Sequence, residues 1–297
     1  MIARSNAIRY SVSDKIFLGV GWVILSVILI VVLYPLLFVV SASFSAGPSI
    51  MSLSLIPPRP TIAGYQIVLQ YQDIWVGYAN SLFYMGVGTF INLFLTVLCA
   101  YPLSRPDFRG RGFIMVLCLI TMYFSGGMIP NFLLVRNLGL LNTRWALLLP
   151  GGMSIFNMII MRTYFSTQVP GEVLESAQMD GCGNIRFMLR ILLPLSTPIL
   201  AVLGLFYAVT HWNAYFDAMI YLRNRSLFPL SLILREILVI NTANIDQMEI
   251  SQLMLLEERR NVMRYSVIVI STLPVMLLYP FVQKYFVKGM MIGSVKG

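Results

Sequence analysis

The sequence predicts an all-α membrane protein, a bundle of six transmembrane helices, and its composition and hydropathy lead to that fold class. Of its 297 residues, 58% are apolar and only 11% are charged, and the mean hydropathy is +0.80. A soluble domain carries about a quarter charged residues, so this chain lacks the charge that would cover a surface facing water. These values exclude a soluble enzyme, a disordered protein and a secreted disulfide scaffold.

Each predicted crossing is a stretch of mostly apolar residues, because a helix needs about 20 of them to span the hydrocarbon of a bilayer. The first stretch is free of charge and too long for the apolar part of a signal peptide, so we expect a retained anchor. The fourth is the shortest. In chain order, the six stretches cover residues 16–40, 77–104, 112–135, 145–161, 191–216 and 265–283.

Proline recurs inside these stretches. Each proline removes a backbone donor and bends its helix, and the freed carbonyls need partners from neighbouring helices or water. Bent helices suit a protein that encloses a cavity, although proline is in any case commoner in membrane helices than in soluble ones. The prolines concerned are Pro35, Pro102, Pro130, Pro194, Pro198, Pro274 and Pro280.

The basic residues predict the orientation of the bundle. Six crossings place both termini on one side, and that side carries twelve of the 21 Lys and Arg residues. Short loops rich in these residues mark the cytoplasmic face, so we expect both termini there, with 1–15 and 284–297 as cytoplasmic segments. Residues 16–76 then form the first helix and an outer loop, and 77–283 the core domain. Arg136 and Arg144 run against this rule.

The segment 162–194 is too polar for a crossing and predicts a short amphipathic helix on the cytoplasmic side. Pro170 favours a helix start, and acidic side chains follow in the first turns, where the helix dipole stabilises them. Val173, Leu174 and Ala177 form a narrow apolar stripe. Such a helix lies on lipid headgroups or docks into a partner protein, and its acids favour docking.

Two residues set the end of this helix and the start of the next. Gly181 is expected to stop the helix as a C′ glycine, because a side chain there would require a left-handed backbone costing about 1 kcal/mol or more. Asn184 is expected to cap a second helix that continues into the fifth crossing.

The same segment carries a specific motif. Glu175-Ser176-Ala177, Gly181, Ile191, Leu193 and Pro194 reproduce the spacing EAA-x3-G-x9-I-x-L-P, with Ser176 in place of the usual second alanine. This resembles the EAA loop of the permeases of binding-protein-dependent ABC importers. Residues 80–82, 100–105 and 293–297 also resemble carbohydrate permeases of the maltose-system type. Residues 126–140 resemble the subgroup that imports complex oligo- and polysaccharides, among them bacterial alginate importers.

This resemblance implies a type I importer fold in the bacterial inner membrane and a set of partners. The chain would form the translocation path with a second homologous permease and receive its saccharide from a periplasmic or extracellular solute-binding protein. It would dock on ATP-binding subunits, two in the whole complex, which bind ATP and Mg, while this chain holds no cofactor or metal. The implied ATPase contacts are Glu172, Glu175, Ser176, Ala177, Asp180 and Gly181, with Ser294, Val295 and Lys296 in the C-terminal tail.

The residues alone indicate that this chain has no nucleotide-binding site. A phosphate-binding loop needs Gly-Lys followed by Ser or Thr, and none of the four lysines follows a glycine. The chain is therefore expected to be a transport subunit rather than an enzyme. The net charge of +9 does not indicate nucleic-acid binding, because no basic patch is interleaved with exposed aromatic residues. The expected surroundings are membrane lipid and the partner subunits.

A candidate substrate path lies in the polar and aromatic run His211, Trp212, Asn213 and Tyr215. Polar groups inside a membrane usually face a cavity, and aromatic faces with hydrogen-bond donors suit sugars. The alternative is an ordinary belt of interfacial aromatic residues. Outward-facing arginines would attract an acidic saccharide, and the resemblance to alginate importers implies that this saccharide is alginate-like. Those arginines are Arg136, Arg144, Arg223 and Arg225.

Two other function classes fit the sequence less well. A secondary transporter driven by an ion gradient usually carries intramembrane carboxylates or inverted repeats. No acidic residue lies deep in a predicted crossing, and the segments do not repeat. A membrane-embedded enzyme would need paired acids or a histidine cluster at one depth. The secondary transporter remains the alternative. The segment 226–264 is interpreted as lying outside the membrane or as re-entrant, and as either a contact for the binding protein or a solvated lid with no specific role.

Overall fold

The computed structural model describes residues 11–45, 55–57, 60–168, 171–238, 263–280 and 283. Its regular elements are helices, apart from one isolated antiparallel bridge between Ser45 and Pro60. The prediction of an all-α protein is thereby confirmed. The chain divides into two units, Met1–Val68 with Ile245–Ile270, and Leu69–Asn244 with Ser271–Gly297.

The first unit contains α1 (Val12–Ser43), a helix of 32 residues that covers the predicted crossing 16–40. Its apolar side chains point in all directions, as expected of a helix surrounded by lipid, and only its last three residues are buried. There Ser43 Oγ lies 2.7 Å from Tyr65 Oη on α2 (Ala63–Gln70). The Ser43 carbonyl also accepts a 3.1 Å hydrogen bond from Ser266 Oγ, in the first turn of the helix Met263–Pro280.

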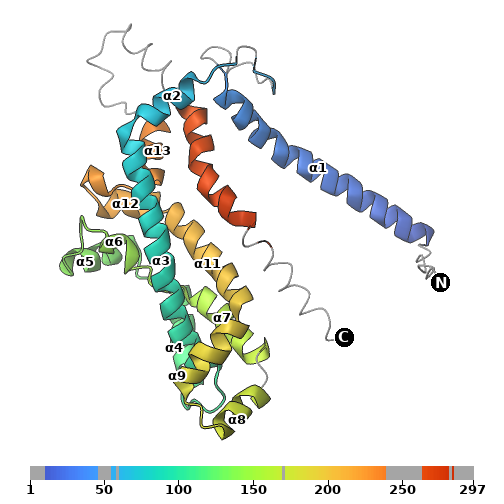
Figure 1. Ribbon diagram of the computed structural model, residues 1–297, viewed down its shortest axis with the longest axis vertical. Coiled ribbons are helices and arrows are strands. Elements are labelled where there is room, and N and C mark those ends of the chain that lie inside the picture. The colour runs from blue at the N-terminus through green and yellow to red at the C-terminus, as the bar shows by residue number, and fades with distance from the viewer. Residues whose placement is uncertain are drawn as a thin grey trace. The chain divides into compact units, whose positions relative to one another are not determined.

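The second unit is built around α3 (Gln72–Ser104), which is 33 residues long and covers the second predicted crossing. Two helices pack along it, α11 (Thr197–Trp212) and α7 (Ile155–Gln168), as Figure 1 shows. Towards the Ser104 end of α3, their apolar side chains form a core that includes Leu103, Met161 and Leu203. A second core towards the other end includes Tyr84, Leu148 and Tyr221.

The third predicted crossing, 112–135, is not one continuous helix. It consists of α4 (Arg111–Tyr123) and α5 (Met128–Asn137), which are bent by 110° relative to each other. The break contains Gly126 and Gly127, and Gly127 has a positive φ of 85°. Consecutive glycines disfavour a helix. The hydropathy averaged over the whole stretch stays apolar, so it does not reveal the break.

The fourth predicted crossing, 145–161, is interrupted in the same way. The structure has α6 (Trp145–Leu148), a non-helical stretch over 149–154, and α7 from Ile155. Pro150 cannot donate a helical hydrogen bond, and two glycines follow it. Helix α7 continues to Gln168, beyond the predicted end.

The fifth predicted crossing is also bent. The first part comprises α9 (Asn184–Phe187), the π-helical turn η2 (Met188–Leu192) and α10 (Leu193–Leu195), and α11 follows at an angle of 82°. Pro198 lacks the N–H group that would reach the carbonyl of Pro194, and Thr197 Oγ1 donates to that carbonyl instead at 2.7 Å. A proline and a π-helical turn are both established causes of a kink.

The prediction that Asn184 caps α9 was wrong. Gly183 occupies the N-cap position, and Asn184 is the first residue of the helix. The Gly183 carbonyl accepts the first helical bond, from the Phe187 N–H at 2.9 Å. A glycine can serve at this position because its extended backbone carries no side chain to hinder the turn.

Of the described helices, three are long and apolar enough to cross a membrane, namely α1, α3 and Met263–Pro280, or up to five if each bent pair counts as one crossing. Several predictions fall outside the described residues. These are the tail 284–297 with Ser294, Val295 and Lys296, residue Pro170, and positions 239–262 of the long outer segment.

Candidate functional site

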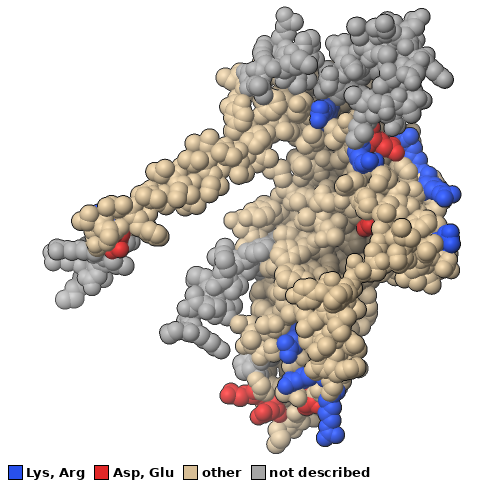
Figure 2. All heavy atoms as spheres, turned by 180° about the vertical axis from the view of Figure 1, so that it is seen from behind, with Lys and Arg blue, Asp and Glu red and all other residues tan. Residues whose placement is uncertain are grey.

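The first candidate site is the helix that carries the motif, α8 (Gly171–Met179). Its predicted contact residues Glu172, Glu175 and Ser176 are exposed, and so is Asp180 just after its end. Figure 2 shows acidic and basic side chains gathered at the end of the second unit to which α8 belongs. A helix with such a polar outer face is suited to contact another protein or water.

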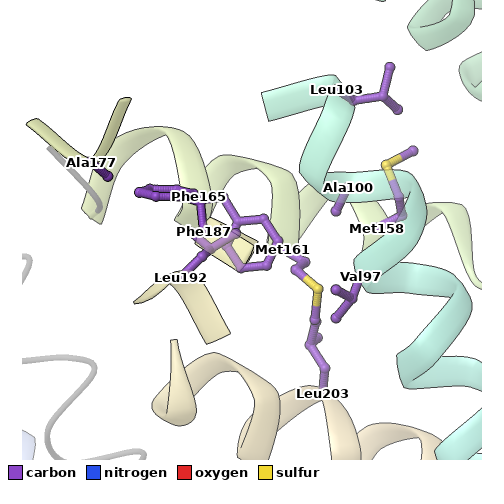
Figure 3. Packing of buried hydrophobic residues seen from close by; sticks show 10 residues of the cluster. All are labelled: Val97, Ala100, Leu103, Met158, Met161, Phe165, Ala177, Phe187, Leu192 and Leu203. Carbon is purple, nitrogen blue, oxygen red and sulfur yellow. The ribbon is translucent and has the colours of Figure 1, made fainter. Parts of the chain in front are cut away.

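The inner face of α8 holds it firmly to the rest of the unit. Ala177 is buried, with 7% of its surface exposed, and it packs into the core that contains Phe165 of α7 and Phe187 of α9 (Figure 3). Val173 and Leu174 are half-buried against the same core. The predicted apolar stripe is therefore confirmed, and a force on α8 would be carried directly to α7 and α9.

Gly181 ends α8 in a left-handed conformation, with φ of 72°. The Gly181 N–H donates to the Gln178 carbonyl at 3.0 Å, and the Cys182 N–H donates to the Ala177 carbonyl at 2.9 Å. This pair of bonds is the Schellman motif, which satisfies the last carbonyls of a helix. We call α8 together with residues 180–182 the docking corner.

A groove of about 610 Å³ runs along the docking corner. Its acidic side comes from α8, and its basic side comes from α9 and η2. Cation and anion thus face the same groove, which favours a partner surface with mixed charge. The charged residues of the lining are Glu172, Asp180, Arg186 and Arg190.

Two arginines form hydrogen bonds near the helix ends around this corner. Arg105, which follows α3, is 8% exposed and donates to both carboxylate oxygens of Asp107 at 2.9 Å. These hydrogen bonds from the guanidinium lower the pKa of Asp107 below its usual value. Arg162 of α7 donates through Nε to the Leu103 carbonyl at 3.1 Å. The end of α3 is therefore fixed to α7.

The second candidate site is a cavity of about 890 Å³, here called the polar cavity. Its walls come from α3, α5, α6, the stretch 149–154, α7, α11 and α12 (Tyr215–Tyr221). Apolar side chains alternate with hydrogen-bonding groups in the lining, as is usual for a ligand site. The polar side chains are Asn92, Asn131, Ser154, Asn157, Tyr207, Thr210, His211, Asp217 and Tyr221.

The structure brings one of the four predicted path residues, His211, into this lining. Trp212 is buried beside Tyr78, with ring centres 6.0 Å apart. Asn213 is exposed and donates to the Val209 carbonyl at 2.9 Å. Tyr215 is exposed and lies 6.0 Å from the Arg235 guanidinium. Sequence reasoning did not select the asparagines of the cavity, although polar side chains inside crossings were a signal for them.

A buried amide joins three segments at the cavity wall. Asn92 of α3 donates through Nδ2 to the Gly151 carbonyl at 2.6 Å, and its Oδ1 lies 2.8 Å from His211 Nε2. Gly88 lies one turn before Asn92, and a Cβ atom there would overlap the imidazole of His211. The absence of a side chain at Gly88 thus allows His211 to approach α3.

A second set of bonds extends this network. Thr96 Oγ1 donates to the Asn92 carbonyl at 2.6 Å and lies 2.8 Å from Tyr207 Oη of α11. Tyr207 Oη also accepts from the Ser154 N–H at 3.2 Å. Non-helical backbone inside a membrane is tolerated where it lines a cavity and finds such partners, and the stretch 149–154 meets both conditions.

At the other end of α3, its side chains hold the segment 226–230. Asn80 Nδ2 donates to the carbonyls of Ser226 and Phe228, at 2.8 and 3.1 Å. Arg144 donates to Asn80 Oδ1 at 3.2 Å and lies 4.5 Å from the centre of the Phe83 ring. The position of Arg144, which runs against the charge rule, thus has a structural cause.

Two of the arginines expected to attract an acidic saccharide are therefore engaged within the protein. Arg144 is one, and Arg225 is the other, since it pairs with Asp73 at 2.8 Å and with Glu236 at 3.5 Å. Arg136 and Arg223 are exposed.

No protein-family model matches the chain, but individual proteins do. It is 40% identical over 266 residues to the polygalacturonan/rhamnogalacturonan transport system permease protein YtcP of Bacillus subtilis, which covers 89% of this chain and 92% of that protein. It is 31% identical over 220 residues to the arabinooligosaccharides transport system permease protein AraQ of the same organism, covering 73% of this chain and 72% of AraQ.

One solved structure resembles the fold closely. It is a bacterial ABC transporter involved in the import of the acidic polysaccharide alginate, and its matching chain is 35% identical. The match has a TM-score of 0.84 and covers 94% of this chain and 100% of that chain.

Proposed function

This chain belongs to the permeases of binding-protein-dependent ABC importers of oligo- and polysaccharides, and from that premise we propose that it forms half of the path for an acidic saccharide. It is a multi-pass membrane protein and a transport subunit, not an enzyme. The observation that supports coupling of this path to a separate ATPase is the docking corner. Its acidic residues face outward, while Ala177 anchors α8 in the core shared with α7 and α9.

The docking corner is the proposed contact with a separate ATPase subunit. Glu172, Glu175 and Asp180 would meet basic residues of that subunit, and the arginines on the other side of the groove would meet its acids. Because Ala177 is buried in the core shared with α7 and α9, movement of the ATPase would be transmitted to the crossing helices. The tail residues Ser294, Val295 and Lys296 are proposed to reach the ATPase subunits as well.

The proposed topology has six crossings with both termini in the cytoplasm. The pairs α4 with α5 and α9–α10 with α11 each form one bent crossing, and α6 with α7 forms the fourth. Support comes from the helix ends near the docking corner, which carry Arg105, Arg109, Arg111, Arg162, Arg186 and Arg190. Such an excess of arginine is typical of the cytoplasmic face.

The polar cavity is the proposed half of the translocation path, completed by a second, homologous permease. Its amides and hydroxyls suit saccharide hydroxyl groups, and its volume is in the range of ligand sites. An acidic substrate is favoured because YtcP is described as a polygalacturonan/rhamnogalacturonan permease and the matching structure as an importer of alginate.

The function is tested with the whole complex in proteoliposomes, including the partner permease, the ATPase subunits and a binding protein loaded with saccharide. Uptake that requires ATP and the binding protein, measured over acidic and neutral saccharides, is the expected result. Uptake by this chain alone under a proton or sodium gradient, with no ATP, would instead establish the secondary transporter.

Cross-linking tests the docking corner separately. In a background where Cys99, Cys118 and Cys182 are replaced by Ser, Asp180→Cys should cross-link to a cysteine placed on the ATPase subunit. Arg223→Cys is the matched control, because it is also exposed but lies near the opposite end of α3. Equal cross-linking from both positions, or none from position 180, would contradict the proposed contact.

A further inference from the structure

Helix α7 begins at the wall of the polar cavity. Ser154 precedes its first residue, and Ser154 Oγ accepts from the Asn157 N–H at 3.4 Å while the Ser154 carbonyl accepts from the Met158 N–H at 2.9 Å. Within the described part of the chain, the backbone N–H groups of Ile155 and Phe156 have no hydrogen-bond partner. The first N–H groups of a helix form its positive end and attract anions.

An unused amide lies at the same place. The side chain of Asn157 lines the cavity although the residue is only 7% exposed. Among the described residues, its amide group forms no hydrogen bond, in contrast to Asn92 in the neighbouring wall. A buried polar side chain almost always has a partner, so an amide left open towards a cavity is available to a molecule that enters it.

Negative charge is distributed unevenly around the cavity. Asp217 of α12 is the one charged side chain in the described lining, and no lysine or arginine contributes to it. The carboxyl-terminal turn of α11, which is the negative end of that helix, also contributes Thr210 and His211. An anion in the cavity would therefore be repelled from α12 and the end of α11 and attracted to the start of α7.

We infer that the amino-terminal end of α7, together with the Asn157 amide, binds a carboxylate of a uronic acid residue in the transported saccharide. The inference rests on the proposed function and specifies the substrate class of that same cavity. Partial charges at helix ends bind carboxylates and phosphates in many proteins, and transporters use interrupted helices for this purpose. A site made of neutral dipoles also lets a charged substrate leave, as transport requires.

The test compares two probes with the same sugar backbone, trigalacturonate and its fully methyl-esterified form, in which each carboxylate is replaced by an uncharged methyl ester. Uptake is measured with the complete transporter in proteoliposomes, and each variant is expressed relative to the native complex for the same probe. This ratio removes any preference of the binding protein. Asn157→Asp has the shape of the native residue but places a negative charge at the site, and Asn157→Ala removes the amide without adding charge.

We expect Asn157→Asp to lower uptake of trigalacturonate by about tenfold or more, because a hydrogen bond to a charged group is replaced by repulsion. Uptake of the ester should stay within about twofold. Asn157→Ala should lower trigalacturonate uptake by roughly threefold to tenfold and spare the ester. Asn137→Asp, the same change at an exposed position outside the lining, should alter neither probe.

Three results would overturn the inference. One is an equal loss of both probes in Asn157→Ala, which would show a structural role for the amide. The second is unchanged trigalacturonate uptake in both Asn157 variants. The third is a native complex that imports the ester and not the acid. A native complex that imports no saccharide with ATP would instead refute the proposed function, and the inference with it.

Discussion

Asn92 Oδ1 of α3 lies 2.8 Å from Nε2 of His211 in α11. The amide nitrogen of Asn92 is already committed to the Gly151 carbonyl at 2.6 Å, so the oxygen is the atom that faces the imidazole. His211 must therefore carry its hydrogen on Nε2. One asparagine thus positions the histidine of the polar cavity and also holds the non-helical stretch before α7.

Replacing Asn92 by Ala should destabilise the protein. The Gly151 carbonyl and His211 Nε2 would both lose their buried partner, and an unsatisfied buried group costs about 1–3 kcal/mol. Thermal unfolding of the purified complex measures the effect. The control is Asn213→Ala at an exposed position, which should change the free energy of unfolding by less than about 0.5 kcal/mol. Equal melting temperatures for both variants would show that the Asn92 network contributes little.

Gly88→Ala tests the close approach of His211 to α3. The added methyl group would overlap the imidazole, and forced repacking in a well-packed interior costs about 1–3 kcal/mol. Gly86→Ala is the matched control, since a Cβ atom there meets no atom within 4 Å. The double variant Gly88→Ala with His211→Ala should lose less stability than the two single variants lose together, because the overlap disappears. Strict additivity would mean that the two residues are not in contact.

The sequence predicted the long crossings, and the short helix that stops at Gly181, better than the cavity. A run of this length with few or no charges is expected to cross the membrane as a helix, so α1 and α3 could be predicted directly. The breaks before Met128 and Ile155 were missed because hydropathy was averaged across Gly126-Gly127 and across Pro150-Gly151-Gly152. Those residues were the available signal, since glycine pairs and proline interrupt helices.

The cavity residues were harder to predict, for a geometric reason. Neighbours along a helix point in different directions. Of the four predicted residues His211, Trp212, Asn213 and Tyr215, only His211 therefore reaches the lining. The lining is assembled from positions as distant as Asn92 and Asp217, which only the packing of α3, α7 and α11 brings together.

The segment 226–230 should depend more on Asn80 than on Arg225. Asn80 is 3% exposed and donates to two backbone carbonyls, so Asn80→Ala should cost about 1–3 kcal/mol. Arg225 forms its ion pairs at the surface, where such pairs contribute about 0–1 kcal/mol. Hydrogen exchange over residues 226–230 and thermal unfolding should both rank the variants in this order. A larger effect of Arg225→Ala would show that the surface ion pairs hold this segment.

Gly181→Ala should weaken the coupling between ATP hydrolysis and transport. A residue with a Cβ atom at φ of 72° is strained by about 1 kcal/mol, which opposes the two bonds that end α8. Gly183→Ala is the control two residues away, because its φ is −71° and a Cβ atom there has open space. We expect fewer saccharide molecules imported per ATP hydrolysed in Gly181→Ala, and native coupling in Gly183→Ala. Gly181→Asn should lie between them, since asparagine tolerates the left-handed conformation better than alanine. If Gly181→Ala coupled as well as the native complex, the turn would not determine how α8 engages the ATPase.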